Sequence, residues 1–435
     1  MIINFFRQHA ILIQRLWQAI SGLILVGFLT HYLSVVQQGW YYSFLSLSSL
    51  FTIFDLGLSV VLLQLAAHYF FGHQWGEKGL IHGKNADQFL SLLSQSSHLY
   101  LKLGCVFCLV MIPAGIIFFG LKSNNFNLIG PWHIPWIILI VATTLNIFLL
   151  PVFSVIEGSG SIKEIYSIRL IQGVLGSLAC WIVLVNGGVL WAATMIPLCA
   201  FLVGILWTLF RYSTLLQDAF KQKGHHIRWS KEVWPFQWRI GLSWLSGYLL
   251  TQIYTPILFY YHGAAVAGQM GLSLTLANML GLLAQSWIAR RVPSMAQAVR
   301  QKKWQDFDQI FRRDFMVSVV FYLFGVLAFC SLYQLISGTK YSERILSFWP
   351  FLGLLVVVLI NHIGGALAAH LRSYKKEPLV WVSLGGTVLT VPIAFISAAY
   401  YSVSGVVGSI LLVQLLLTLP LSVHLWVKYN KVWRQ

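Results

Sequence analysis

Residues 44–67 read FLSLSSLFTIFDLGLSVVLLQLAA, an apolar run with a single carboxylate, Asp55, near its middle. About 20 apolar residues are enough to cross the ~30 Å hydrocarbon core of a bilayer, so this run predicts a membrane-spanning helix. A charged side chain at the bilayer centre costs about 3 kcal/mol on insertion scales. Such a residue is rarely kept for packing, and Asp55 therefore indicates a transport pathway or a gate. The Asp55-Leu56-Gly57 sequence also predicts a break in the helix.

The composition of the whole chain agrees with this interpretation. Of the 435 residues 58% are hydrophobic and only 9% are charged, and the mean hydropathy is +0.74. Soluble domains carry about 25% charged residues, so the sequence predicts an integral membrane protein. The spans must be helices, because the strands of membrane barrels are shorter runs of alternating polarity.

Long apolar runs recur from one end of the chain to the other, separated by short polar connections. We count about twelve, each near the length needed to cross a membrane. They cover approximately 17–35, 43–68, 98–121, 134–156, 166–187, 190–210, 237–260, 266–289, 315–337, 346–370, 379–401 and 404–427.

The formal net charge of +17 is distributed unevenly between the predicted loops. With twelve spans, the N-terminus, the even-numbered loops and the C-terminus share one side, which takes all Lys and Arg except Lys122, Lys340 and Arg344. The positive-inside rule then predicts that both termini are cytoplasmic. We expect the basic loops to contact anionic membrane lipids rather than nucleic acid, because none is long enough for an ordered basic domain.

The chain divides near its middle at a long polar connection. We predict an N-terminal six-helix lobe at 1–212, a cytoplasmic linker at 213–236 and a C-terminal six-helix lobe at 237–435. Two halves with an even number of spans have the same topology, which favours a two-lobed transporter with its substrate site near the midplane.

Several arginines are placed at the cytoplasmic ends of the predicted spans. Arg15, Arg169, Arg239 and Arg290 could simply snorkel to the lipid headgroups. If they instead face the interior, they form a basic vestibule suited to a diphosphate, because guanidinium groups bind phosphate in a bidentate manner. We treat these four as candidate substrate-binding residues.

Two acidic residues and four amides complete the candidate site. Asp55 and Glu157 are the candidates for gating or proton coupling, since intramembrane carboxylates often have that role. Polar residues inside spans are candidates for lining a hydrated cavity: Gln64, Gln252, Asn278 and Asn361.

Motifs that would indicate an enzyme are weak. Asp306-Phe-Asp308 matches the D-x-D pattern of metal-dependent glycosyltransferases, but it is flanked by Lys and Arg and is better explained as a solvated helix face. The histidines and cysteines have no metal-ligand spacing, and no predicted outer loop is long enough for a catalytic domain. We therefore expect no enzyme activity, no metal and no cofactor.

The order and spacing of several short motifs are similar to a known family. The chain resembles the oligosaccharide or polysaccharide flippases, including proteins described as lipopolysaccharide biosynthesis proteins and O-antigen flippases. They belong to a superfamily that also contains multidrug-and-toxin extruders and lipid II flippases. The residues that carry the resemblance are Leu29-Thr30, Gln38-Gly39-Trp40-Tyr41-Tyr42, Asp55-Leu56-Gly57-Leu58, Glu157-Gly-Ser-Gly160 with Arg169, Pro235-Phe-Gln-Trp-Arg239, Ser243-Trp244, Gly247-Tyr248, Ala267-Gly-Gln-Met-Gly-Leu-Ser273 and Trp287-Ile288 with Pro293.

This resemblance implies two six-helix lobes around a central cavity that work by alternating access. The implied cargo is a polyprenyl-diphosphate-linked oligosaccharide, moved across the bacterial inner membrane. The implied partners are the polysaccharide polymerase and glycosyltransferases of the same pathway. In one respect the sequence departs from the family: many relatives carry an Arg about seven residues after the D-x-G glycine, where this chain has Gln64.

Two other functions remain open. A small-molecule exporter of the same fold would use Asp55 to couple transport to a cation or proton, and would bind cationic cargo through ion pairs and aromatic rings. A membrane glycan polymerase or ligase would need a longer outer loop than this sequence contains.

Overall fold

A computed structural model describes residues 10–83, 86–121, 130–222, 227, 229–374, 376 and 378–434. Within these residues the chain is almost entirely helical, apart from one two-residue antiparallel strand pair, β1 (Gln74–Trp75) and β2 (Ile81–His82). The predicted outer loop that contains Lys122 lies outside the described residues, as do residues 223–226 and 228 of the predicted linker.

The chain forms two compact units. Unit 1 comprises Met1–Gln37 and Phe44–Leu245, and unit 2 comprises Gln38–Ser43 and Ser246–Gln435. The predicted linker at 213–236 lies within unit 1, and the lobe boundaries predicted from the sequence stay predictions.

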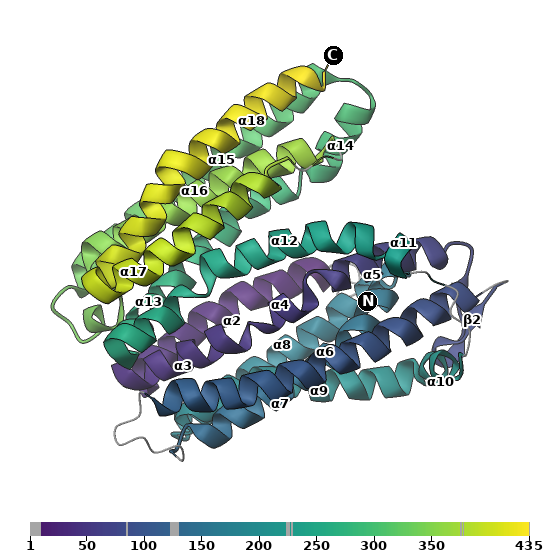
Figure 1. Cartoon of the computed structure of the whole chain (residues 1–435), viewed down its shortest axis with the longest axis horizontal. Helices are drawn as coiled ribbons and strands as arrows, with labels where there is room; N and C mark the ends of the chain where they lie inside the picture. Colours follow the sequence, from purple (N-terminus) through teal and green to yellow (C-terminus); the bar gives the residue numbers. More distant parts are fainter. Residues whose placement is uncertain are drawn as a thin grey trace. The chain divides into compact units, whose positions relative to one another are not determined.

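Unit 1 is a helical bundle in which α6, α7, α8 and α9 pack side by side and α2 lies against α8 (Figure 1). Its 3₁₀ turns are η1 (Glu77–Gly79) and η2 (Val189–Trp191). Its helices are α2 (Ala10–Tyr32), α3 (Val35–Ser48, shared with unit 2), α4 (Phe51–Asp55), α5 (Leu58–Tyr69), α6 (Asp87–Gly120), α7 (His133–Gly158), α8 (Ile162–Val185), α9 (Ala192–Arg211), α10 (Ser213–Lys221), α11 (Trp229–Glu232) and the first part of α12 (Trp234–Thr251).

Unit 2 is built around α13, which contacts α15, α16 and α17. A buried apolar cluster that includes Leu258, Met270 and Leu355 fills the space between these helices. The elements are α13 (Tyr254–Ala289), α14 (Val292–Arg300), α15 (Trp304–Ile336), η3 (Ser342–Arg344), α16 (Phe348–Arg372), α17 (Val380–Val413), the π-helical turn η4 (Gln414–Thr418) and α18 (Leu419–Val432).

The helices account for the predicted spans. Nine helical runs among the described residues are long and apolar enough to cross a membrane, and the bent pair Val35–Asp55 and Leu58–Tyr69 makes a tenth. Two of the nine, Ile240–Ala289 and Val380–Val432, contain 50 and 53 residues. At 1.5 Å per residue each is at least about 75 Å long, enough for two crossings of a ~30 Å core. The prediction of an all-helical membrane protein with about twelve spans is confirmed.

Backbone breaks divide these two double-length runs where the sequence predicts a turn. Gly263 has φ 84° and ψ −179° inside α13, and Ser402 has φ 53° and ψ −139° inside α17. Both lie between predicted spans, at 260–266 and 401–404. A glycine tolerates a positive φ because it has no Cβ, whereas Ser402 is strained there.

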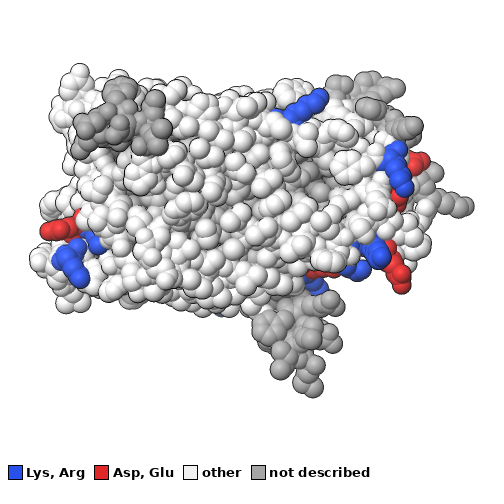
Figure 2. All heavy atoms as spheres, turned by 90° about the horizontal axis from the view of Figure 1, so that it is seen from below, with Lys and Arg blue, Asp and Glu red and all other residues white. Residues whose placement is uncertain are grey.

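The surface fits a chain that crosses a membrane. Figure 2 shows a face with a broad region of uncharged side chains. Large apolar side chains such as Leu109, Phe210 and Leu327 are exposed at 75%, 79% and 63%. Exposed apolar area of this extent is unusual for a soluble protein and is expected where lipid covers the helices. The structure supports a multi-pass membrane protein, and its orientation stays a prediction.

Candidate functional site: a buried carboxylate and four groups of charged residues

Asp55 lies at a sharp break in the second span. It ends α4, and α5 begins three residues later after a bend of 44°. Leu56 and Gly57 between them have φ values of 44° and 69°. A Cβ at Gly57 would lie 2.4 Å from Cγ2 of Ile240 and 3.0 Å from Cδ1 of Trp244, both on α12 in the same unit. The break therefore needs a glycine for its backbone angle and for the close approach of α12.

The Asp55 side chain is only 5% exposed and is held by three donors. Oδ2 accepts a hydrogen bond from Oγ of Ser59 at 2.9 Å, and Oδ1 accepts one from the Ser59 backbone N–H at 3.3 Å. Oδ1 also accepts a short hydrogen bond from the Tyr100 hydroxyl on α6. These charge-assisted bonds, with the positive end of the α5 dipole, offset the cost of burying a carboxylate.

The partners of Asp55 are two hydroxyl groups and one backbone amide, and its role as a gate or proton site stays a prediction. Tyr100 and Ser59 are functional candidates that sequence reasoning missed. Ser59 could have been found from its position one helical turn after Asp55, whereas Tyr100 is 45 residues away and leaves no local signal.

Glu157 and Arg169, predicted to have different roles, contact each other. Nη2 of Arg169 donates to Oε2 of Glu157 at 2.8 Å, between the end of α7 and the first turns of α8. The guanidinium also lies over the Tyr166 ring, 5.2 Å from its centroid. Because Glu157 neutralises Arg169, this pair attracts a diphosphate less than a free arginine would.

A second ion pair lies beside the α7–α8 turn. Arg211 at the end of α9 donates to Glu164 at 3.1 Å, and the Tyr212 hydroxyl donates to the same carboxylate at 2.9 Å. Burial, followed by the negative charge of Glu164, raises the pKa of the Tyr212 phenol above its ordinary value. The Tyr212 hydroxyl therefore stays protonated and serves as a hydrogen-bond donor.

In unit 2, two arginines share one carboxylate. Nη2 of Arg290 donates to Oδ1 of Asp314 at 2.9 Å, and Nε of Arg291 donates to Oδ2 at 3.2 Å. The Asp314 side chain is 5% exposed, while those of Arg290 and Arg291 are 56% and 42% exposed. The group carries a formal charge of +1 with several guanidinium N–H donors on the surface. Sequence reasoning selects Arg290 as a candidate but misses Asp314.

The other predicted basic residues belong to unit 1. Arg15 lies exposed on α2 in unit 1. The side chain of Arg239 lies outside the described residues. Arg15, Arg169 and Arg239 belong to unit 1 and Arg290 to unit 2, so the basic vestibule stays a prediction.

The four predicted cavity amides come from different elements of the chain. Gln64 is exposed on α5, Asn278 is half-buried on α13, and Gln252 is half-buried between α12 and α13. Asn361 on α16 is exposed, and its Oδ1 accepts a hydrogen bond from Nε2 of Gln414 at 3.0 Å. These four amides are not among the residues that line the cavities of unit 1 and unit 2 described below.

In unit 2, His362 lies inside a predicted span and forms a hydrogen-bonded group with two other polar side chains. Nδ1 of His362 lies 2.8 Å from Oε1 of Gln285, and its Nε2 lies 3.0 Å from Oγ of Ser318. An amide oxygen can only accept, so Nδ1 carries the proton and Nε2 faces the serine. His362 is 4% exposed and stacks on Tyr322. This pattern is that of a hydrogen-bonded packing histidine.

The D-x-D motif makes a structural contact. Both carboxylate oxygens of Asp308 accept hydrogen bonds from the guanidinium of Arg434, one of them at 2.7 Å from Nη1. The hydrogen bond to Asp308 is the main reason that the pKa of Arg434 is raised above its ordinary value. Among the described residues no group of three or more His, Cys, Asp or Glu side chains could hold a metal ion.

Two cavities lie within unit 1. One of about 430 Å³ is almost wholly apolar and is lined by residues of α6, α7, α9 and α10, including His98 and Phe148. The other, of about 260 Å³, lies between α3 and α7 and includes Ser48 and Asn146. The described residues that line them include no Lys or Arg that would bind a diphosphate.

Comparisons with known proteins identify the fold. No family model and no curated protein matches the sequence. Solved structures do match. An inward-facing multidrug resistance MATE family transporter of the MOP superfamily is 13% identical, with a TM-score of 0.61 over 96% of this chain and 99% of that one. The lipid II flippase MurJ in an inward closed conformation is 12% identical, with a TM-score of 0.67 over 95% and 86%.

The chain has the fold of these transporters. A mutant of the Vibrio cholerae MATE transporter VcmN matches as well, with 14% identity and a TM-score of 0.59 over 99% of this chain and 98% of that one. The fold expected from the resemblance is therefore confirmed, whereas membership of the superfamily and of the polysaccharide flippase family stays a prediction. All three proteins are transporters or flippases, and the expectation that this chain is not an enzyme stays a prediction.

Proposed function

We propose that this protein flips a polyprenyl-diphosphate-linked oligosaccharide, an O-antigen or other surface polysaccharide unit, across the bacterial inner membrane by alternating access. The observation that carries the proposal is the group formed by Arg290, Arg291 and Asp314. Two partly exposed guanidinium groups are held by one buried carboxylate. The net positive charge and the remaining N–H donors suit a diphosphate.

In the predicted orientation this group lies at the cytoplasmic end of α13, where a lipid-linked diphosphate would be collected. The sugars then pass through the protein while the prenyl chain stays in lipid. The fold supports transport in general, and both a multidrug transporter and a lipid flippase share it. Polysaccharide polymerase and glycosyltransferases of the same pathway are the proposed partners.

The test uses the purified protein in liposomes with a labelled polyprenyl-diphosphate oligosaccharide on one leaflet. Hydrogen bonds to charged groups contribute about 1.5–3 kcal/mol each, so replacing both Arg290 and Arg291 with Ala should lower flipping at least tenfold. The double Lys variant keeps the charge but loses the bidentate geometry, so we expect an intermediate rate.

Arg300→Ala is the matched control, because Arg300 is exposed at the end of neighbouring α14. Its flipping rate should equal that of the wild type. Full activity in the double Ala variant would remove the basis of the proposal. Unchanged melting in detergent would separate a binding defect from misfolding.

A small-molecule exporter coupled to protons or cations is the second candidate, and the buried carboxylate of Asp55 favours it. On this alternative, liposomes with a proton gradient would export a cationic dye, and Asp55→Asn would stop the export. Dye export without any lipid flipping would replace the first proposal with this one.

A further inference from the structure

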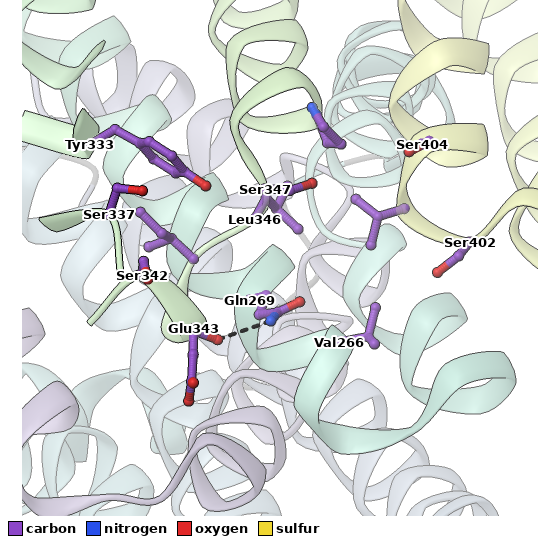
Figure 3. Close-up of a pocket in the computed structure, with 13 residues that line it drawn as sticks. Val266, Gln269, Tyr333, Ser337, Ser342, Glu343, Leu346, Ser347, Ser402 and Ser404 are labelled. Carbon is purple, nitrogen blue, oxygen red and sulfur yellow. Dashed lines mark hydrogen bonds between the residues drawn. The ribbon is translucent and has the colours of Figure 1, made fainter. Parts of the chain in front are cut away.

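A polar cavity lies at one end of unit 2 and belongs to neither the Asp314 group nor the His362 group. Its volume is about 420 Å³, within the ~300–1,000 Å³ typical of small-molecule sites. Four segments meet there: the middle of α13, the end of α15 with the loop that follows, the start of α16, and the break in α17. Figure 3 shows their side chains around one hollow.

Several polar groups that line this cavity are available to a ligand. Ser347 is the N-cap residue of α16, yet its hydroxyl makes no capping hydrogen bond. An N-cap serine usually accepts a bond from the first turn, so both Ser347 and the helix N-terminus keep unused hydrogen-bonding capacity. Nε2 of Gln269 donates to the Glu343 carbonyl at 2.9 Å, as Figure 3 shows, which fixes the amide at the cavity wall.

The backbone strain at Ser402 is located at the same cavity. Its φ of 53° and ψ of −139° would suit glycine, and a residue with a side chain pays about 1–3 kcal/mol there. Strain of this kind is often kept where it positions a functional group. Here the break places Ser402 and Ser404 in the cavity wall, which they share with Gln269 and the start of α16.

The chemistry of the wall indicates the class of ligand. The described residues that line the cavity include five serines, one glutamine, one tyrosine and one carboxylate, Glu343, and none is Lys or Arg. A phosphate would find no cation among them. Groups that both donate and accept hydrogen bonds, with an aromatic ring such as Tyr333, match a ligand rich in hydroxyl groups.

We propose that this cavity is a binding site for a carbohydrate residue. The inference rests on the proposed function, whose cargo contains sugars, and it names the part of the protein that recognises them. In the predicted orientation the loop that contains Lys340 and Arg344 is on the outer side, so the cavity would contact the glycan after it has crossed the membrane.

The test measures binding of free sugars to the full-length protein in lipid nanodiscs by saturation-transfer NMR. The probes are a panel of neutral monosaccharides and disaccharides, with tetramethylammonium and inorganic phosphate as cation and anion probes. Ser347→Ala removes a hydroxyl that bonds to the ligand, and Glu343→Gln replaces charge-assisted hydrogen bonds with weaker neutral ones. Each substitution should therefore weaken sugar binding about threefold to tenfold.

Asp306→Asn is the matched control for the lost carboxylate, since Asp306 is exposed in the first turn of α15, at the other end of that helix from Tyr333. It should bind sugars as the wild type does. All variants are compared by melting temperature, and Ser347→Ala should melt normally because no capping bond is lost.

The proposal is overturned if no sugar binds, if both variants bind sugars normally, or if only the cation binds and Glu343→Gln abolishes that binding. The flipping assay keeps this result separate from the proposed function. Sugar binding without flipping contradicts the function alone, and flipping without sugar binding contradicts this inference alone.

Discussion

Replacing Gly57 with Ala should destabilise unit 1 by two separable effects. The first is backbone strain, because an L-residue in the left-handed region costs about 1–2 kcal/mol. The second is a clash, because the new Cβ would lie 2.4 Å from Cγ2 of Ile240 and 3.0 Å from Cδ1 of Trp244. Overpacking of this kind costs about 1–3 kcal/mol, so the expected loss is about 2–5 kcal/mol.

The two effects can be separated with a second substitution. Ile240→Ala removes Cγ2, the atom closest to the new Cβ. The double variant should therefore regain the stability lost to the clash but not the stability lost to backbone strain. We expect a coupling energy of about 1–3 kcal/mol in the double-mutant cycle, measured by denaturant unfolding in detergent and followed by circular dichroism. In a thermal melt the single Gly57→Ala variant should lose on the order of 10 °C.

Gly247→Ala is the matched control. Gly247 lies on the same helix as Ile240, its φ is not positive, and a Cβ added there would meet nothing within 4 Å. Alanine there should be neutral or stabilising by about 0.5–1 kcal/mol, because it restricts the unfolded chain. A Gly57→Ala protein with wild-type stability, or a double variant no more stable than the sum of the single ones, would refute the packing described here.

Three further substitutions test the Asp55 site and the ion pair of Asp308 with Arg434. Asp55→Asn should lower the free energy of unfolding by about 1–3 kcal/mol, since charge-assisted hydrogen bonds become neutral ones. It should also abolish transport while membrane insertion stays normal. Flipping in liposomes at the wild-type rate would exclude a gating role for Asp55. Tyr100→Phe should cost about 1 kcal/mol and leave most of the transport activity, because Ser59 still donates twice to Asp55. Asp308→Asn should change the melting temperature little, because an exposed ion pair such as that with Arg434 contributes less than about 1 kcal/mol. Removing divalent metal ions should leave transport unchanged in this variant and in the wild type. A loss of transport would contradict the purely structural role of the D-x-D motif.

Much of the fold follows from local features of the sequence. The apolar runs predict the helices because a backbone in lipid must satisfy its own hydrogen bonds, and helices do so within one segment. The breaks at Gly57, Gly263 and Ser402 lie where the sequence predicts a turn or the end of a span. Asp55 is identified as exceptional because a single carboxylate stands out in an apolar run.

The contacts of the candidate residues depend on packing between segments. The sequence suggests Arg169 and Arg290 as separate phosphate ligands, and the structure pairs each with a carboxylate. Their side-chain direction depends on how the helices rotate about their axes, which the hydropathy of a nearly uniform apolar helix does not determine. For the same reason Asp314 and the cavity around Ser347 leave no signal in the sequence.

By itself the sequence determines that this chain is a helical membrane protein and marks Asp55-Leu56-Gly57 as the break in its second span, because both properties depend on residues close together in the chain. Only the tertiary structure decides that Tyr100 holds Asp55, that Asp314 binds two arginines, and that four segments enclose a hydroxyl-rich cavity. These arrangements join residues far apart in the sequence, and they form because a buried or partly buried polar group must find its partner wherever the packing of the helices places one.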